Sequence, residues 1–111
     1  MIKDIAIIES ENIVISGVND ALDLMATVRY DYNINKIILK KENIIEDFFD
    51  LKTRLAGEIL QKYANYRIKL AIVGDFSSYN SKSLNDFIYE CNSGNQFCFV
   101  TDTEKAVEIL K

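Results

Sequence analysis

Two short stretches of this sequence hold most of the side chains that could bind a ligand or take part in chemistry. They combine carboxylates, hydroxyls and one ammonium group: Asp50, Lys52 and Thr53 in the first, and Asp75, Ser77, Ser78 and Tyr79 in the second. Asp50 and Asp75 could share acid–base work if the fold brought them within several ångströms of each other. The chain contains no histidine, so the commonest general base is missing and no Ser–His–Asp triad can be drawn. The two stretches therefore favour binding over catalysis.

Lys52 lies inside EDFFDLKTRLAGEILQKY, residues 46–63, which has the spacing of an amphipathic helix. One helix through the whole stretch would place Lys52 in the middle of the apolar face. A helix capped by Asp50 would instead begin at about Asp50 or Leu51 and let Lys52 reach solvent from the first turn. Free backbone N–H groups would then lie beside Lys52 and the Thr53 hydroxyl, which suits a small-anion site or a phosphoacceptor at Thr53. The alternative is a capping threonine beside an exposed lysine, with no binding role.

Phe48 and Phe49 come just before this cap. Packing of both rings in the core is favoured, and the alternative leaves one of them exposed as a contact residue. Gly57 lies in the middle of the helix, where it costs about 1 kcal/mol relative to alanine. It indicates either close approach by a neighbouring element or a neutral surface position.

Strand and helix patterns alternate along the chain. β-Branched runs at 2–8 and 13–15 predict an antiparallel hairpin, and buried runs at 36–40, 67–73 and 96–100 predict three further strands. Helical spacing follows each of the last four predicted strands, at about 20–32, 50–65, 81–91 and 102–111. The order ββαβαβαβα predicts an α/β fold with a mainly parallel sheet and an antiparallel N-terminal hairpin. Because ligands gather at the carboxyl ends of parallel strands, both polar stretches should lie on one rim.

Composition restricts the class of protein. The length of 111 residues fits a single domain spanning 1–111, and the net charge of −4 argues against nucleic acid or an anionic membrane as partner. No apolar run could cross a membrane and the start has no signal-peptide pattern, so we expect a cytoplasmic protein. Cys91 and Cys98, without further ligands, predict two reduced thiols and no metal site, and nothing predicts a cofactor.

The motifs between Glu46 and Glu90 are specific enough to suggest a family. EDFFDLKT, LAGEILQK, NYR, KLAIVGDF, SKSL and DFIYE all occur there. With these motifs nearly the whole chain resembles the bacterial domain-of-unknown-function family 4180. That resemblance implies no particular activity.

The element order is also similar, more distantly, to that of STAS domains, the fold of anti-sigma-factor antagonists. In that fold a segment like F-x-D-S-S-G-L opens the second helix, and its serine is phosphorylated to switch partner binding. The matching stretch here is residues 49–55, in which Asp50 takes the place of the acid and Thr53 is the nearest hydroxyl. Lys52 and Arg54 depart from the pattern, because they replace small residues with cations.

Three hypotheses follow. The leading one is a non-enzymatic regulatory or interaction module that binds a protein partner or a small anion at the rim, with Thr53 as a switch. The alternative is a small nucleotide- or phosphometabolite-binding domain or enzyme using Asp50, Lys52 and Asp75. The third is a structural subunit that buries its antiparallel edge in a homodimer, so both a monomer and a homodimer stay open.

Overall fold

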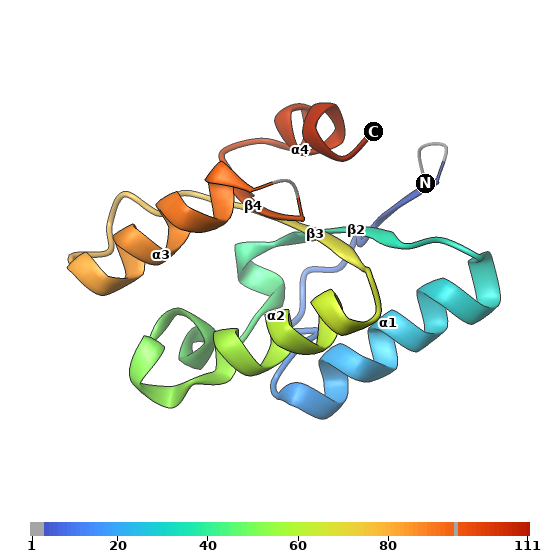
Figure 1. Ribbon diagram of the computed structural model, residues 1–111, viewed down its shortest axis with the longest axis horizontal. Coiled ribbons are helices and arrows are strands. Elements are labelled where there is room, and N and C mark those ends of the chain that lie inside the picture. Colours follow the sequence, from blue (N-terminus) through green and yellow to red (C-terminus); the bar gives the residue numbers. More distant parts are fainter. Residues whose placement is uncertain (1–3, 95) are drawn as a thin grey trace.

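The computed structural model describes residues 4–94 and 96–111 and shows an α/β fold (Figure 1). The strands are β1 (Ile5–Ile7), β2 (Lys36–Lys40), β3 (Lys69–Val73) and β4 (Phe97–Val100). The α-helices are α1 (Val18–Tyr32), α2 (Leu55–Asn65), α3 (Lys82–Ser93) and α4 (Thr103–Leu110). Three short 3₁₀ turns, η1 (Lys41–Asn43), η2 (Glu46–Phe49) and η3 (Leu51–Thr53), lie between β2 and α2.

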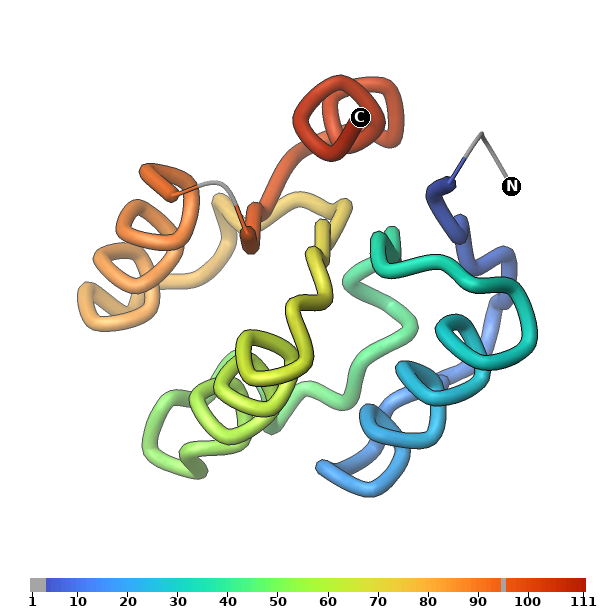
Figure 2. The backbone as a smooth tube through the Cα atoms, turned by 45° about the vertical axis from the view of Figure 1, so that its right-hand side comes forward, coloured from blue at the N-terminus to red at the C-terminus, as the bar shows by residue number. Residues whose placement is uncertain are grey.

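The four strands form one sheet in the order β1-β2-β3-β4, and every neighbouring pair is parallel. A parallel sheet that grows in one direction through right-handed crossovers puts its connecting helices on the same face. α1, α2 and α3 accordingly pack over one face, whereas α4 lies alone on the other, as Figure 2 shows. Alternate strand residues point to the two faces, so Ile37 and Leu39 join the larger core while Ile38 packs towards α4.

The predicted antiparallel hairpin is absent from the described residues. β1 pairs in parallel with β2, and residues 13–15 form no strand beyond one parallel bridge between Ile15 and Ile44. Asn43 explains this difference. Its buried amide donates to the carbonyls of Ser10 and Asn12, both at 2.9 Å, and its backbone carbonyl accepts the N–H of Ile15 at 3.0 Å. The polar groups that a hairpin ladder would pair are therefore bonded to the chain that follows β2.

Helix α2 begins at Leu55 and not, as predicted, at about Asp50 or Leu51. Asp50 does act as a cap, because its carboxylate accepts the N–H of Lys52 at 3.1 Å, but it caps the single turn η3. Arg54 then adopts a left-handed conformation with φ 64° and separates η3 from α2. The sequence-based start was wrong because a residue with positive φ ends a right-handed helix.

Helix α1 begins at Val18, ahead of the predicted start at about residue 20, and its N-cap residue Gly17 makes no side-chain capping bond. Three other helix ends have caps at the predicted bounds. Asn33 ends α1 in a left-handed conformation, the Ser81 hydroxyl accepts the N–H of Leu84 at the start of α3, and Asp102 accepts the N–H of Lys105 at the start of α4. Tyr63 of α2 is fully buried and donates from its hydroxyl to the carbonyl of Ala21 at 2.8 Å. That bond ties α2 to α1 beneath the sheet.

Candidate functional site

The candidate site is the rim, which we define as residues 41–54 and 74–81. These segments follow the adjacent parallel strands β2 and β3, so they leave the sheet at the same edge. The ring of Tyr79 stacks on that of Phe49 with centroids 5.6 Å apart and 23° between the planes. The Tyr79 hydroxyl donates to Glu46 Oε1 at 2.6 Å, so ring and hydroxyl both join the two segments.

Lys41 is the cation at the centre of the rim. Its ammonium lies 4.7 Å from the centroid of the Tyr79 ring, which is a cation–π contact, and donates to the Asp75 carbonyl at 3.3 Å. The stem of Lys41 crosses directly over Gly74. A β-carbon at position 74 would lie 2.6 Å from Lys41 Cβ, so this approach requires glycine.

Tyr79 is only partly exposed, and its surroundings favour the neutral phenol. Burial raises the pKa of Tyr79, and the hydrogen bond to Glu46 and the charges of Glu46 and Glu42 raise it further. The phenol is therefore protonated at neutral pH and acts as a hydrogen-bond donor. Asp75 shows the opposite shift, because hydrogen bonds from Ser77 lower the pKa of its carboxyl.

A chain of aromatic rings supports the rim from below. Phe48 and Phe49 are both buried, with their ring centroids 5.1 Å apart, which confirms the favoured prediction that both rings pack in the core. From Phe49 the contacts continue to Phe76 at 5.9 Å and from Phe76 to Phe99 at 5.4 Å. The two predicted phenylalanines thus hold the rim in place and expose little surface of their own.

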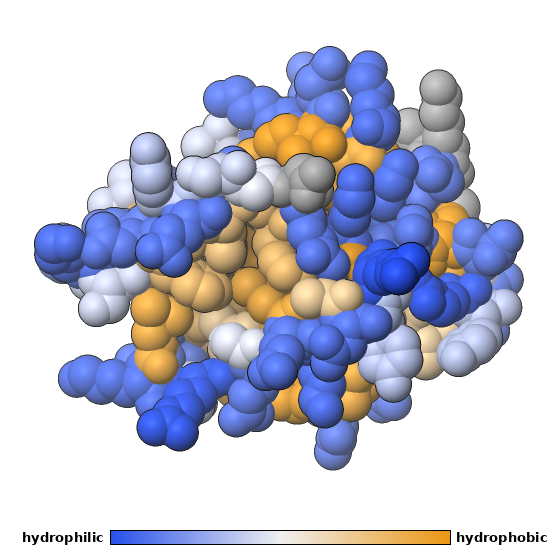
Figure 3. Space-filling view, viewed as in Figure 1, coloured by the Kyte–Doolittle hydropathy of each residue, from blue (hydrophilic) through white to orange (hydrophobic). Residues whose placement is uncertain are grey.

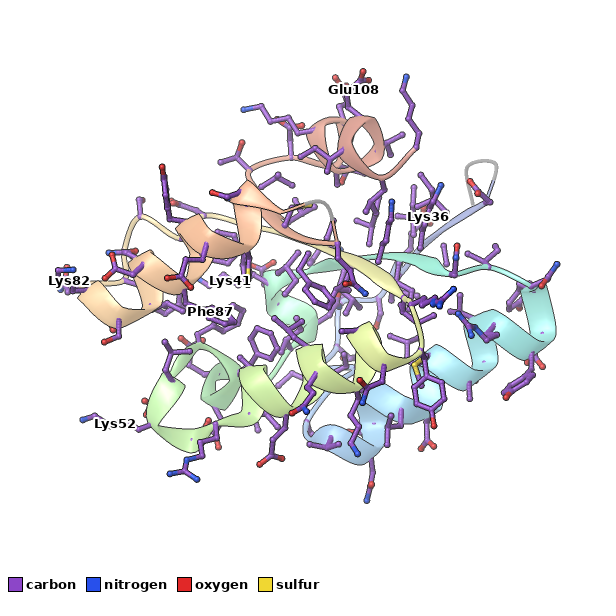
Figure 4. The ribbon with its side chains drawn as sticks, viewed as in Figure 1. Lys36, Lys41, Lys52, Lys82, Phe87 and Glu108 are labelled. Carbon is purple, nitrogen blue, oxygen red and sulfur yellow. The ribbon has the colours of Figure 1, made fainter. Side chains whose placement is uncertain are left out.

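The first polar stretch is held together by local bonds. The Thr53 hydroxyl lies 2.7 Å from the Asp47 carbonyl and 2.8 Å from the Asp50 carbonyl, and its oxygen accepts the N–H of Leu55 at 3.2 Å. Lys52 is exposed, as predicted, and points away from the molecule in Figure 4. Thr53 therefore fixes the turn in front of α2.

The second polar stretch is a separate group. Asp75 Oδ1 accepts both the backbone N–H of Ser77, at 2.9 Å, and its hydroxyl, at 2.6 Å, while Ser78 is exposed. Among the described residues no hydrogen bond or ion pair joins Asp50, Lys52 or Thr53 to these residues. The fold brings the two stretches to one rim through Phe49 and Tyr79, and not through a carboxylate pair.

Sequence reasoning missed Lys41, Glu46 and Asn43. Lys41 is the first residue after the buried strand β2, and Gly74 directly follows β3. That arrangement was a usable signal, since a glycine at a strand exit can mark a close approach by the neighbouring connection. Glu46 and Tyr79 are 33 positions apart in the sequence, so their contact cannot be recognised from local residue spacing.

The remaining chemistry-bearing groups lie outside the rim. The thiols of Cys91 and Cys98 are free; burial raises the pKa of each to about 11, and they pack against clusters on opposite faces of the sheet. Five of the cavities on the described residues have volumes of about 230–300 Å³, and none of these five is lined by a predicted site residue. Within the same residues no set of three His, Cys, Asp or Glu side chains is placed to hold a metal ion. No helix there combines the length and apolar character needed to span a bilayer.

Comparison with known proteins identifies the family of the chain but no characterised relative. Searches of curated proteins and of solved structures each returned no match. A family model described as "Domain of unknown function (DUF4180)" matches residues 2–110, which is nearly the entire chain and includes the rim. The chain therefore belongs to the DUF4180 family.

Proposed function

We propose that this chain is a non-enzymatic regulatory module that binds a protein partner through the rim. The observation that carries the proposal is the Lys41–Tyr79–Phe49 arrangement, in which a partly exposed tyrosine is held by a ring, a cation and Glu46. Tyrosines fixed in this way are typical anchors of protein interfaces, because little conformational entropy is lost when they bind. The two titratable rim groups with shifted pKa values move away from neutrality, which supports binding over acid–base catalysis.

An apolar strip beside the rim supports a macromolecular partner. Figure 3 shows it crossing the middle of this face, between α3 and the segment that precedes α2, with hydrophilic surface on either side. Leu51, Leu55, Phe76 and Phe87 are half-buried there and pack against the core. Polar surface around an apolar centre is the ordinary anatomy of a protein interface.

The charge of the carboxyl edge indicates the chemistry of the partner. The connections that follow the four strands, 8–17, 41–54, 74–81 and 101–102, carry mostly acids. The acids are Glu9, Glu11, Glu42, Glu46, Asp47, Asp50, Asp75 and Asp102, and the bases are Lys41, Lys52 and Arg54. A partner with a basic surface suits this edge better than a small anion does.

We further propose that phosphorylation of Thr53 switches the rim. A phosphate at Thr53 would remove the hydroxyl donor that now faces the backbone carbonyls of Asp47 and Asp50 and would add negative charge beside those carbonyl oxygens. Lys52 and Arg54 flank the position and would pair with the new phosphate. The distant resemblance to STAS domains is consistent with this proposal, because residues 49–54 lie between β2 and α2, close to where that fold carries its phosphorylated segment.

The test compares matched variants of the immobilised protein. Proteins retained from a lysate would be identified, and the Kd of each purified partner measured against wild type and against Tyr79→Ala and Thr53→Glu. Tyr89→Ala and Thr27→Glu are matched controls on exposed helix positions. We expect Tyr79→Ala and Thr53→Glu to weaken binding at least tenfold and the controls to leave it unchanged. Equal affinity across all five proteins would exclude the rim as the binding surface.

The alternative is a nucleotide- or phosphometabolite-binding role for Asp50, Lys52 and Asp75. These residues line none of the five cavities, and no hydrogen bond or ion pair joins the first two to the third within the described residues. A thermal-shift screen tests it, since ligand at 100 times its Kd adds about 2.7 kcal/mol of stability. No shift across a panel of nucleotides and phosphorylated metabolites would count against this role.

A further inference from the structure

The amino edge of the sheet, by which we mean the side at which the parallel strands begin, has the opposite charge to the rim. The four-residue segments that lead into β2, β3 and β4, residues 33–36, 66–69 and 94–97, contain Lys36, Arg67 and Lys69 and no acid. Lys36 and Lys69 are direct neighbours in the register of the sheet, where like charges repel. In a chain with a net charge of −4, this edge is a local concentration of positive charge.

Two of these cations have no partner among residues 4–94 and 96–111. Lys36 is paired with Asp4 at 3.3 Å, and the nearby Arg29 donates to the carbonyl of Tyr66 at the end of α2. The side chains of Arg67 and Lys69, in contrast, make no hydrogen bond or ion pair in the part of the chain that the structure describes. Their charges are therefore available to a ligand.

Arg67 and Lys69 meet at a cavity. Together with Ala64 and Gln96 they line a hollow of about 240 Å³ where α2 runs into β3. Figure 3 shows strongly hydrophilic surface over that junction. Gln96, which lines the hollow, donates one amide hydrogen to the Ile68 carbonyl at 3.3 Å, and its second amide hydrogen has no partner among the described residues.

The backbone at Arg67 is informative. Its φ of 58° is a left-handed conformation that glycine adopts without strain and that costs other residues about 1 kcal/mol or more. An arginine here keeps a guanidinium beside the cavity at the expense of that strain. A guanidinium offers paired hydrogen-bond donors, and an ammonium offers a compact positive charge. Proteins commonly bind phosphate groups with these two kinds of side chain.

We propose that Arg67, Lys69 and Gln96 form a binding site for the phosphate group of a small molecule. The guanidinium and the ammonium would neutralise a doubly charged phosphate, and the Gln96 amide would add a neutral donor. The cavity volume suits one or two phosphate groups and a small organic substituent. The site lies at the opposite edge of the sheet from the rim and does not depend on the function proposed for the rim.

The test is a titration of the full chain with pyrophosphate at an ionic strength of about 0.15 M, in which backbone amide NMR spectra are recorded at each concentration. Inorganic phosphate and glycerol 3-phosphate, titrated in parallel, distinguish a free phosphate ion from a phosphate ester as the natural ligand. Saturable shifts concentrated at residues 64–69 and at Gln96 are expected for at least one probe. Shifts that do not saturate, or that centre on residues 41–54, would overturn the proposal.

Two arginines of equal backbone geometry provide the control. Arg67→Gly and Arg54→Gly both relieve a positive φ, at 58° and 64°, and each removes one positive charge. Arg67→Gly and Lys69→Gln should each raise the Kd at least tenfold, roughly the worth of a charge-assisted hydrogen bond, while Arg54→Gly should leave it within twofold. Equal weakening by the two glycine variants would show that only net charge matters, and the site would be rejected.

Discussion

Replacing Asn43 should destabilise the fold, because its buried side chain holds the segment after β1 against the chain that follows β2. Asn43 is 0% exposed and its side chain makes three hydrogen bonds, two to the carbonyls of Ser10 and Asn12 and one from the N–H of Lys40 at 3.0 Å. A buried hydrogen bond contributes about 1 kcal/mol net, and orphaning its partner adds to the loss. Asn43→Ala removes all three, so we expect the free energy of unfolding to fall by about 3 kcal/mol.

Asn43→Asp is a sharper version of the same perturbation. The shape is kept and an oxygen still accepts from Lys40, but an ionised carboxylate would face two carbonyl oxygens with no hydrogen to donate. Burial and those carbonyls would raise the pKa of the introduced carboxyl, so the folded state would bind the proton more tightly than the unfolded state. The sign follows from linkage: this variant should regain stability relative to wild type as the pH falls.

Urea unfolding followed by circular dichroism measures both effects at pH 7 and pH 5. Asn80→Ala is the control, since Asn80 is exposed and its side chain makes no hydrogen bond within the described residues. It should change the free energy of unfolding by less than about 0.5 kcal/mol. A loss below about 1 kcal/mol in Asn43→Ala would refute the reasoning, because one ordinary hydrogen bond would then account for the residue.

Three further predictions concern stability. Gly57→Ala should stabilise the protein by about 0.5–1 kcal/mol, because a β-carbon there meets nothing within 4 Å; a loss on urea unfolding would contradict this. Gly74→Ala should destabilise it by about 1–3 kcal/mol, because the new methyl group displaces Lys41; Gly17→Ala, where the space is open, is the control. Burial raises the pKa of Cys98 from 9.0 to about 11, so its contribution to stability is complete below about pH 9 and is lost as the pH rises through about 11. Unfolding midpoints at pH 7, 9 and 11 should therefore fall in wild type more than in Cys98→Ala, and parallel falls would contradict the assignment.

The core strands and the starts of α3 and α4 were predictable because their signals are local. The run Lys36–Lys40 is apolar in its middle three residues, and a strand covered on both faces needs that pattern. Ser81 and Asp102 each bond a backbone N–H three residues ahead, so the cap can be recognised from residue type and spacing. Burial and capping act over a few residues and leave a readable pattern.

The N-terminal hairpin and the start of α2 were mispredicted because distant or conformational causes decide them. Ile13, Val14 and Ile15 have strand-forming side chains, but the hydrogen-bond partners of this segment come from Asn43, about thirty residues ahead. The start of α2 depends on the left-handed φ of Arg54, a residue type that ordinarily continues a helix. In both places a tertiary arrangement overrides the local preference.

The opposite charges of the two sheet edges arise from the order and direction of the strands. Arg67 and Lys69 lie only a few residues from Asp75, yet β3 runs between them and carries them to opposite edges. Because all four strands are parallel, every connection that follows a strand adds to the acidic edge, and the connections that precede β2, β3 and β4 add to the basic one. A net charge of −4 conceals this separation, so the composition argument against nucleic acid or an anionic membrane does not exclude a small anion at one edge of the sheet. A basic partner at the rim and a phosphate group at the amino edge would therefore bind at opposite edges of the sheet without competing.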